Sequence, residues 1–154
     1  MPKAILIDTS LLLLLIVGLT DRRLIDRHKR LGDYDEDGFD LLVEKLREFS
    51  EVVLTPNTLT ETSNLLRMIG DPDRESLTHT LRDYIQGHTE RYIRSEEASN
   101  EASFIRLGLT DAALMRASRE QMVLLSADHK LYLAATEEGF EALNFAHLYD
   151  TRFG

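Results

Sequence analysis

Several features that define common protein classes are missing from this chain. Its 154 residues include no cysteine, which excludes disulfides, thiolate zinc sites and cysteine catalysis and fits a reducing, cytoplasmic environment. The chain also has no excess of positive charge, since its formal net charge is −9. Proteins that bind nucleic acid through its phosphates usually have a basic face, so the net charge alone argues against nonspecific binding to a phosphate backbone. The charge is compatible with binding metal ions or a basic protein partner.

Long apolar segments and several familiar catalytic motifs are absent as well. The apolar run Leu11–Val17 is far shorter than the roughly 20 residues that cross a bilayer, so we expect no membrane segment. The sequence has no glycine-rich phosphate loop and no serine nucleophile elbow, and its histidines lack the spacing of zinc ligands.

The residues that are present predict alternating strands and helices. Short apolar runs predict strands at Ala4–Ile7, Val52–Leu54, Val123–Leu125 and Leu143–Phe145. Longer helical patterns cover Ser10–Leu19, Asp40–Phe49, Thr58–Ile69, Arg74–Tyr92, Glu96–Leu107, Asp111–Glu120 and Lys130–Glu138. The alternation predicts a single α/β domain over residues 1–154, a three-layer α/β/α fold with a central parallel sheet of four or five strands.

Four acidic residues stand at positions where a site could form. Asp8 directly follows the first predicted strand, and Asp128 comes three residues after the third. Sites of open parallel sheets lie outside the carboxyl ends of the strands, so we expect both carboxylates at the same edge of the sheet. Glu61 and Asp111 lie on predicted helices and share a face with apolar residues, so both should point toward the protein body.

Carboxylates that converge need a compensating positive charge. Burying an unpaired charge is costly, and neighbouring carboxylates raise each other's pKa. Mg²⁺ or Mn²⁺ resolves both problems, because these ions prefer oxygen ligands. Such an ion lowers the pKa of a coordinated water and stabilises negative charge on a leaving oxygen, which is the chemistry that phosphodiester hydrolysis requires.

Each acid also has an ordinary structural interpretation. Asp128 could cap the helix that follows it, and Asp8 could form an Asx turn. Asp111 could be favoured at a helix start by the helix dipole, and Glu61 could pair with Arg67. Two strand-end positions combined with two inward-facing acids favour one common site over four separate roles.

Four segments of the chain resemble the PIN domain, in the same order and with similar spacing. They are Ile5–Ser10, Leu54–Leu66, Gly108–Ala113 and Leu125–Leu131, and each contains one of the four acids. The resemblance spans nearly the whole chain. It implies a parallel sheet flanked by helices and a Mg²⁺- or Mn²⁺-dependent endoribonuclease, with metal-site and catalytic acids at Asp8, Glu61, Asp111 and Asp128.

The resemblance also implies supporting residues and partners. In that family a hydroxyl residue beside the first acid often supports the site, which here is Thr9 or Ser10, and Ser126 matches the small hydroxyl residue before the last acid. Many bacterial members are VapC-type toxins, held inactive by an antitoxin and often dimeric. An RNA substrate, an antitoxin and a second copy of the chain are therefore the implied partners.

The stretch from Thr20 to Asp40 is longer than the corresponding connection of the small toxins. It holds the densest basic cluster in the chain, formed by Arg22, Arg23, Arg27, His28, Lys29 and Arg30. These residues could hold substrate phosphates beside the metal site, or they could form the solvated face of a helix. The acids from Asp33 to Asp37, with Glu44 further on, match a calcium-binding loop on paper, but Asp37 or Asp40 could equally cap a helix.

Two other classes of function can be compared with the sequence, and both agree with it less well. A non-catalytic PIN-like module that binds nucleic acid or protein would share the fold, although the presence of all four acids favours an enzyme. A phosphatase with an aspartate nucleophile would need a second acid two residues after Asp8, where Ser10 stands.

Overall fold

The computed structural model describes residues 3–154, and its centre is a five-stranded sheet in which all neighbouring strands are parallel. The strands are β1 (Ala4–Ile7), β2 (Glu51–Leu54), β3 (Thr89–Glu90), β4 (Val123–Ser126) and β5 (Ala142–Asn144), in the spatial order β3-β2-β1-β4-β5.

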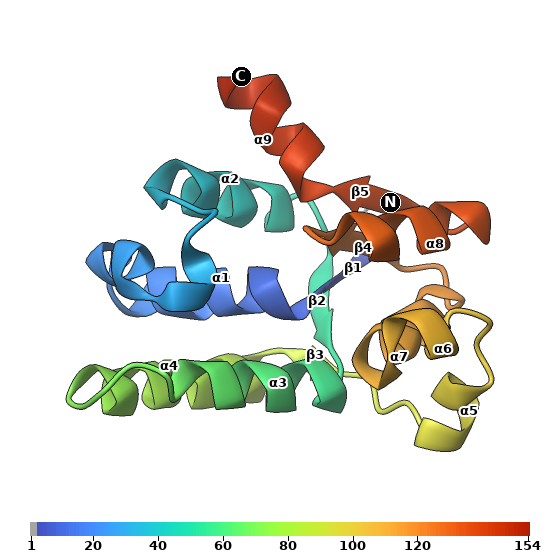
Figure 1. The fold of residues 1–154 in the computed structure, drawn as a ribbon, viewed down its shortest axis with the longest axis horizontal. Coiled ribbons are helices and arrows are strands. Elements are labelled where there is room, and N and C mark those ends of the chain that lie inside the picture. Colours follow the sequence, from blue (N-terminus) through green and yellow to red (C-terminus); the bar gives the residue numbers. More distant parts are fainter. Residues whose placement is uncertain (1–2) are drawn as a thin grey trace.

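Helices cover both faces of this sheet (Figure 1). The α-helices are α1 (Thr9–Thr20), α2 (Glu36–Leu46), α3 (Pro56–Leu66), α4 (Asp73–Gly87), α5 (Ser95–Ser99), α6 (Phe104–Leu107), α7 (Leu109–Ser118), α8 (His129–Glu137) and α9 (Phe145–Phe153). Two short 3₁₀ helices, η1 (Arg22–Arg27) and η2 (Lys29–Leu31), follow α1.

Alternate residues along the three central strands, β1, β2 and β4, contribute to two separate cores. In β1, Ile5 and Ile7 belong to the core formed with α1 to α4, whereas Leu6 belongs to the core formed with α7 and α8. Successive side chains of a strand point to opposite faces, so a sheet covered on both sides needs apolar residues at every strand position. The predicted three-layer α/β/α fold is therefore confirmed.

The order of the strands reverses between β1 and β4. The chain passes from β1 outward to β2 and β3, and then returns to the other side of β1 as β4, where Ile7 pairs with Leu125. Open parallel sheets form their ligand crevice outside the carboxyl ends of the strands at such a switch point. Asp8 follows β1 at this point, so the topology directs its side chain to the crevice.

The apolar run after Asp8 forms the buried centre of α1. Every residue from Leu11 to Val17 is buried, because α1 lies between the sheet and the surrounding helices and contacts α2, α3 and α4. Within residues 3–154, no helix combines the length and the apolar character needed to cross a membrane.

Several predicted elements differ from the structure. The predicted helix Arg74–Tyr92 ends at Gly87, because the next residues extend and form the edge strand β3. The predicted helix Glu96–Leu107 is two short helices, α5 and α6. The last predicted strand shifts to residues 142–144, and Phe145 begins the unexpected helix α9, which Asn144 caps.

The segment between Thr20 and Asp40 is part of the core rather than a loose loop. Leu24, Ile25 and Leu31 of η1 and η2 are buried against α1. Helix α2 begins at Glu36, four residues before the predicted start, because Asp35 caps it by accepting a hydrogen bond from the backbone of Gly38. Of the acids of the calcium-like motif, Asp37 and Glu44 therefore lie within α2 and Asp35 caps it.

Candidate active site

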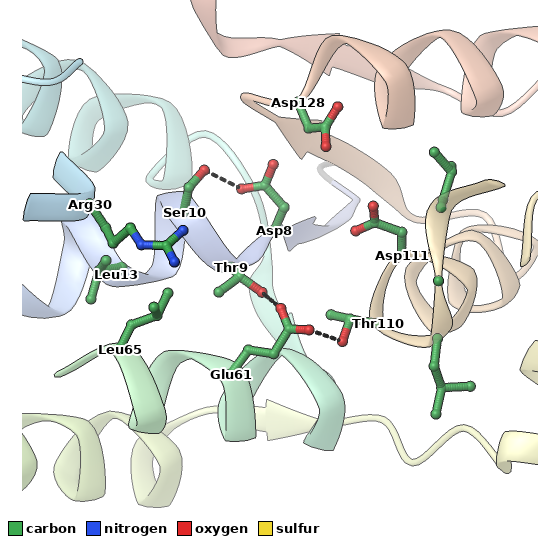
Figure 2. A pocket seen from close by; sticks show the side chains of 13 residues that line it. Asp8, Thr9, Ser10, Leu13, Arg30, Glu61, Leu65, Thr110, Asp111 and Asp128 are labelled. Carbon is green, nitrogen blue, oxygen red and sulfur yellow. Dashed lines mark hydrogen bonds between the residues drawn. The ribbon is translucent and has the colours of Figure 1, made fainter. Parts of the chain in front are cut away.

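All four predicted acids line one cavity of about 470 Å³, which we call the acid pocket. They come from four different elements: Asp8 caps α1, Glu61 lies on α3, Asp111 lies in the first turn of α7, and Asp128 caps α8. Figure 2 shows the carboxylates of Asp8, Asp111 and Asp128 around a common opening, with Glu61 on the neighbouring wall. The expectation that Asp8 and Asp128 share one edge of the sheet is correct.

Asp8 is the most rigidly held of the four acids. Its Oδ1 accepts hydrogen bonds from the backbone of Leu11 (3.1 Å) and from the Ser10 hydroxyl (3.3 Å). Its Oδ2 accepts from the Ser126 hydroxyl (2.6 Å) and the backbone of Ala127 (2.9 Å). These donors are neutral, and burial raises the pKa of Asp8 above its usual value although the hydrogen bonds oppose that shift.

Ser126 connects Asp8 to the segment that carries Asp128. The backbone N–H of Asp128 donates to the Ser126 hydroxyl at 2.9 Å, and that hydroxyl contacts Asp8. Asp128 Oδ1 accepts from the backbone of Lys130 and Leu131 and so caps α8, as its structural interpretation expected. Within the described chain, Asp128 Oδ2 accepts no hydrogen bond and stays available to a ligand.

Glu61 joins two helices through hydroxyl groups. Thr9 donates to one carboxylate oxygen at 2.9 Å, and Thr110 donates to the other at 2.6 Å. The prediction that Glu61 points toward the protein body is wrong, because its side chain is exposed at the rim of the acid pocket. The buried face of α3 consists instead of Thr58, Leu59, Thr62 and Leu66.

Asp111 is half-buried and accepts no hydrogen bond from any residue of the described chain. Gly108, with a φ of 87° that favours glycine, turns the chain between α6 and α7 and so sets Asp111 in the first turn of α7. Burial, and then the negative charges of Asp128, Asp8 and Glu61, raise the pKa of Asp111 to about 7. The four acids therefore interact electrostatically, and none of them forms an ion pair with a basic side chain of the described chain.

Only one member of the predicted basic cluster lines the acid pocket. This residue is Arg30, and its guanidinium forms no ion pair within residues 3–154. Most of the others point elsewhere: Arg22 pairs with Asp40 and Glu36, Arg23 with Asp21, and Arg27 with Asp73, while Lys29 does not line the pocket.

The buried His28 fixes the backbone that carries Arg30. Its Nδ1 accepts from the backbone N–H of Arg30 at 3.1 Å, and its Nε2 lies 2.8 Å from the carbonyl oxygen of Leu65. Figure 2 shows the Arg30 guanidinium beside Ser10 and Leu13, on the side of the acid pocket away from Asp111. A basic group thus stands at the margin of an acidic site.

The oxygen-rich lining fits a hydrated Mg²⁺ or Mn²⁺ better than a closed metal cage. In the part of the chain that the structure describes, no three acidic or histidine side chains are grouped closely enough to hold an ion. Mg²⁺ keeps several waters and commonly binds through one or two carboxylates plus substrate phosphates. Asp111 and Asp128 each have carboxylate oxygens that accept no hydrogen bond within residues 3–154 and could contact such an ion. Asp8 already accepts four hydrogen bonds, so it would contact the ion through a water molecule.

The sequence analysis missed two residues that support the site, one in contact with an acid and one in contact with Ser10. Thr110 stands directly before Asp111, and its hydroxyl adjacent to an acid repeats the pattern of Thr9 beside Asp8. Tyr34 shares a hydrogen bond of 3.1 Å with Ser10, which in turn contacts Asp8. No local pattern marks Tyr34, because only the packing of the 20–40 segment brings its hydroxyl to Ser10.

Neither a scan against models of protein families nor a search of curated proteins found a match to this chain. The resemblance to the PIN domain therefore rests on the four sequence segments and stays a prediction.

Proposed function

We propose that this protein is a Mg²⁺- or Mn²⁺-dependent endoribonuclease that hydrolyses phosphodiester bonds at the acid pocket. The observation that carries the proposal is the convergence of four carboxylates on one cavity without a basic partner for any of them in the described chain. The raised pKa of Asp111, caused by burial and by the other three acids, supports a site that requires a cation.

The role that we assign to each acid depends on how many of its carboxylate oxygens accept no hydrogen bond from the protein. Asp111 and Asp128 would bind the ion directly or through water, and Asp8 would hold its water shell. Glu61, fixed by Thr9 and Thr110, would bind metal or orient the attacking water. When bound, the ion supplies Lewis acidity, which lowers the pKa of a coordinated water and stabilises charge on the leaving oxygen.

Arg30 is the residue best suited to hold a phosphate of the substrate. It lines the acid pocket and is not engaged by an acid in the described chain, and a guanidinium matches the geometry of phosphate oxygens. Its charge would offset part of the repulsion between the acids and the RNA backbone. RNA as the substrate, a toxin role and an antitoxin partner are supported by the PIN resemblance.

One observation favours a second candidate, a non-catalytic binding module. No three acidic or histidine side chains in residues 3–154 form a group that could enclose an ion. Calorimetric titration with Mn²⁺ separates the two candidates, since an enzyme of the proposed type binds the ion and the binding module does not.

The decisive experiment compares RNA cleavage by the wild-type protein with that of Asp8→Asn, purified free of contaminating nucleases. The substitution removes one negative charge and keeps the side-chain shape, but the amide nitrogen faces a backbone N–H that now donates to Asp8. Circular dichroism and the denaturation midpoint of the variant establish that it is folded before its activity is compared. We expect at least a roughly hundredfold loss of Mn²⁺-stimulated cleavage, the size seen when one transition-state stabilising group is lost. Chelator should abolish cleavage by the wild-type protein.

The matched control is Asp83→Asn, which makes the same change at an exposed position on α4 and should leave the rate unchanged. Equal cleavage by Asp8→Asn and wild type, or cleavage that persists in chelator, would contradict the proposed function.

A further inference from the structure

A second cavity opens beside the acid pocket and shares part of its wall. This side cavity has a volume of about 330 Å³ and includes Glu61 and Thr110, which also line the acid pocket. Its other walls come from the first turns of α3 (Pro56, Asn57, Thr60), from the segment between β3 and α5 (Tyr92, Ile93), and from Ser95 at the start of α5. A ligand held at the acids can therefore continue directly into the side cavity.

Tyr92 is an exposed aromatic residue on a fixed backbone. Its side chain is 66% exposed and makes no aromatic contact within the described chain. Its neighbours are nevertheless anchored, because the backbone N–H of Arg91 donates to Leu54 at 2.7 Å and Ile93 is buried in the core. The ring thus stands in solvent at the mouth of the cavity, and its backbone needs no ordering when a ligand stacks on it.

The remaining lining is neutral and has unused hydrogen-bonding capacity. The side chains of Asn57, Thr60 and Ser95 make no hydrogen bond to another residue of the described chain, and Pro56 and Ile93 add apolar surface. No lysine, arginine or histidine lines the cavity, and Glu61 borders it, so a phosphate is disfavoured there. A flat, uncharged group with polar edges fits this chemistry.

We propose that the side cavity binds a nucleobase of single-stranded RNA, one that adjoins the phosphate held at the acid pocket, with Tyr92 stacking on that base. The inference rests on the proposed nuclease function and adds a substrate subsite to it. Unpaired bases stack on aromatic side chains and are recognised by hydrogen bonds to their edges, and the amide of Asn57 offers both a donor and an acceptor for such contacts.

The test uses short single-stranded RNAs that each carry one 2-aminopurine at a different position, bound in Mn²⁺ to the Asp8→Asn protein so that they are not cleaved. We expect fluorescence quenching at one position, where the base stacks on Tyr92. Adding Tyr92→Ala should remove that quenching and weaken RNA binding by roughly tenfold, whereas Tyr92→Phe should preserve both. Phe153→Ala, which removes an exposed aromatic ring on α9, is the matched control and should change neither.

A parallel measurement of cleavage with Asp8 intact separates this inference from the proposed function. If the wild-type protein cleaves RNA and Tyr92→Ala leaves quenching, affinity and KM unchanged, the base subsite is refuted and the nuclease stands. If the Asp8→Asn protein binds none of the RNAs and the wild-type protein cleaves none, both proposals fall.

Discussion

Two buried carboxylates in this protein have opposite surroundings. Glu101, 7% exposed, accepts two hydrogen bonds of 2.9 Å from the guanidinium of Arg119, the residue that caps the C-terminus of α7. Asp8, 5% exposed, accepts hydrogen bonds only from neutral hydroxyl and backbone groups, and the acids that share its pocket are also negative. The first carboxylate is neutralised by the protein itself, and the second is not.

The difference separates a carboxylate that the fold neutralises from the carboxylates to which we attribute metal binding. Glu101 and Arg119 satisfy each other, so their contact joins the end of α5 to α7 and leaves no charge for a ligand. At the acid pocket the uncompensated charge persists in the folded protein, at a cost in stability. A cation that neutralised these carboxylates would remove the cost, and its binding would raise the free energy of unfolding by a corresponding amount. The comparison can therefore be tested by measurements of stability.

The largest expected effect on stability comes from removing the neutralised carboxylate, Glu101. Breaking a buried ion pair costs roughly 3–5 kcal/mol. The Arg119 side chain is 41% exposed and can return to water, so Glu101→Ala should lower the free energy of unfolding by about 2 kcal/mol. Denaturant unfolding measures the loss, and the Mn²⁺-dependent cleavage rate per folded molecule should not change.

Glu97→Ala is the matched control, because Glu97 lies 3.9 Å from Arg116 with both side chains about 40% exposed. It should change the free energy of unfolding by less than about 0.5 kcal/mol. Equal losses in the two variants would show that Glu101 and Arg119 contribute no more than a surface pair.

An intermediate effect is expected at Asp111, and it depends on pH. The folded protein retains the Asp111 proton up to about pH 7, whereas the ordinary pKa of the group is 3.8. The folded state therefore binds more protons between these values, and the free energy of unfolding falls as the pH rises through that interval. Because Asp111 is only half-buried and solvent screens its charge, Asp111→Asn in chelator at pH 8 should be more stable than wild type by about 1 kcal/mol.

Thermal unfolding, measured from the ordinary pKa of 3.8 to above the raised pKa of about 7, checks this prediction. The difference between the two proteins should vanish at the acid end. Added Mn²⁺ should stabilise the wild type more than Asp111→Asn, since the variant lacks a ligand. Parallel pH profiles for the two proteins would argue against an uncompensated carboxylate at this position.

The smallest effect is expected at the basic margin of the acid pocket. Arg30→Ala should weaken RNA binding and reduce the slope of log affinity against log salt by about 1, the value for one lost phosphate contact. Arg27→Ala is the control, because Arg27 is paired with Asp73 at 3.6 Å and does not line the pocket. Salt titrations of RNA binding to Asp8→Asn measure both slopes, and equal slopes for the two substitutions would exclude a specific contact by Arg30.

The layered fold was predictable because its signals are local. An apolar run such as Ala4–Ile7 specifies a strand buried on both faces, and the acid that follows it falls at the carboxyl edge of the sheet whatever the rest of the chain does. The same holds for Asp128 after β4. The edge strand β3 was not predictable, because two exposed residues extend only through their pairing with β2.

The sequence by itself thus determined the α/β alternation and the identity of the four acids. Tertiary structure alone decided how those acids are held: Glu61 reaches Thr9 and Thr110 only because α1, α3 and α7 meet. It also decided that Asp111 has a raised pKa and that Arg30, rather than its basic neighbours, lines the pocket. Burial, charge and hydrogen bonding between distant segments depend on distances in space, and a pattern along the chain does not contain those distances.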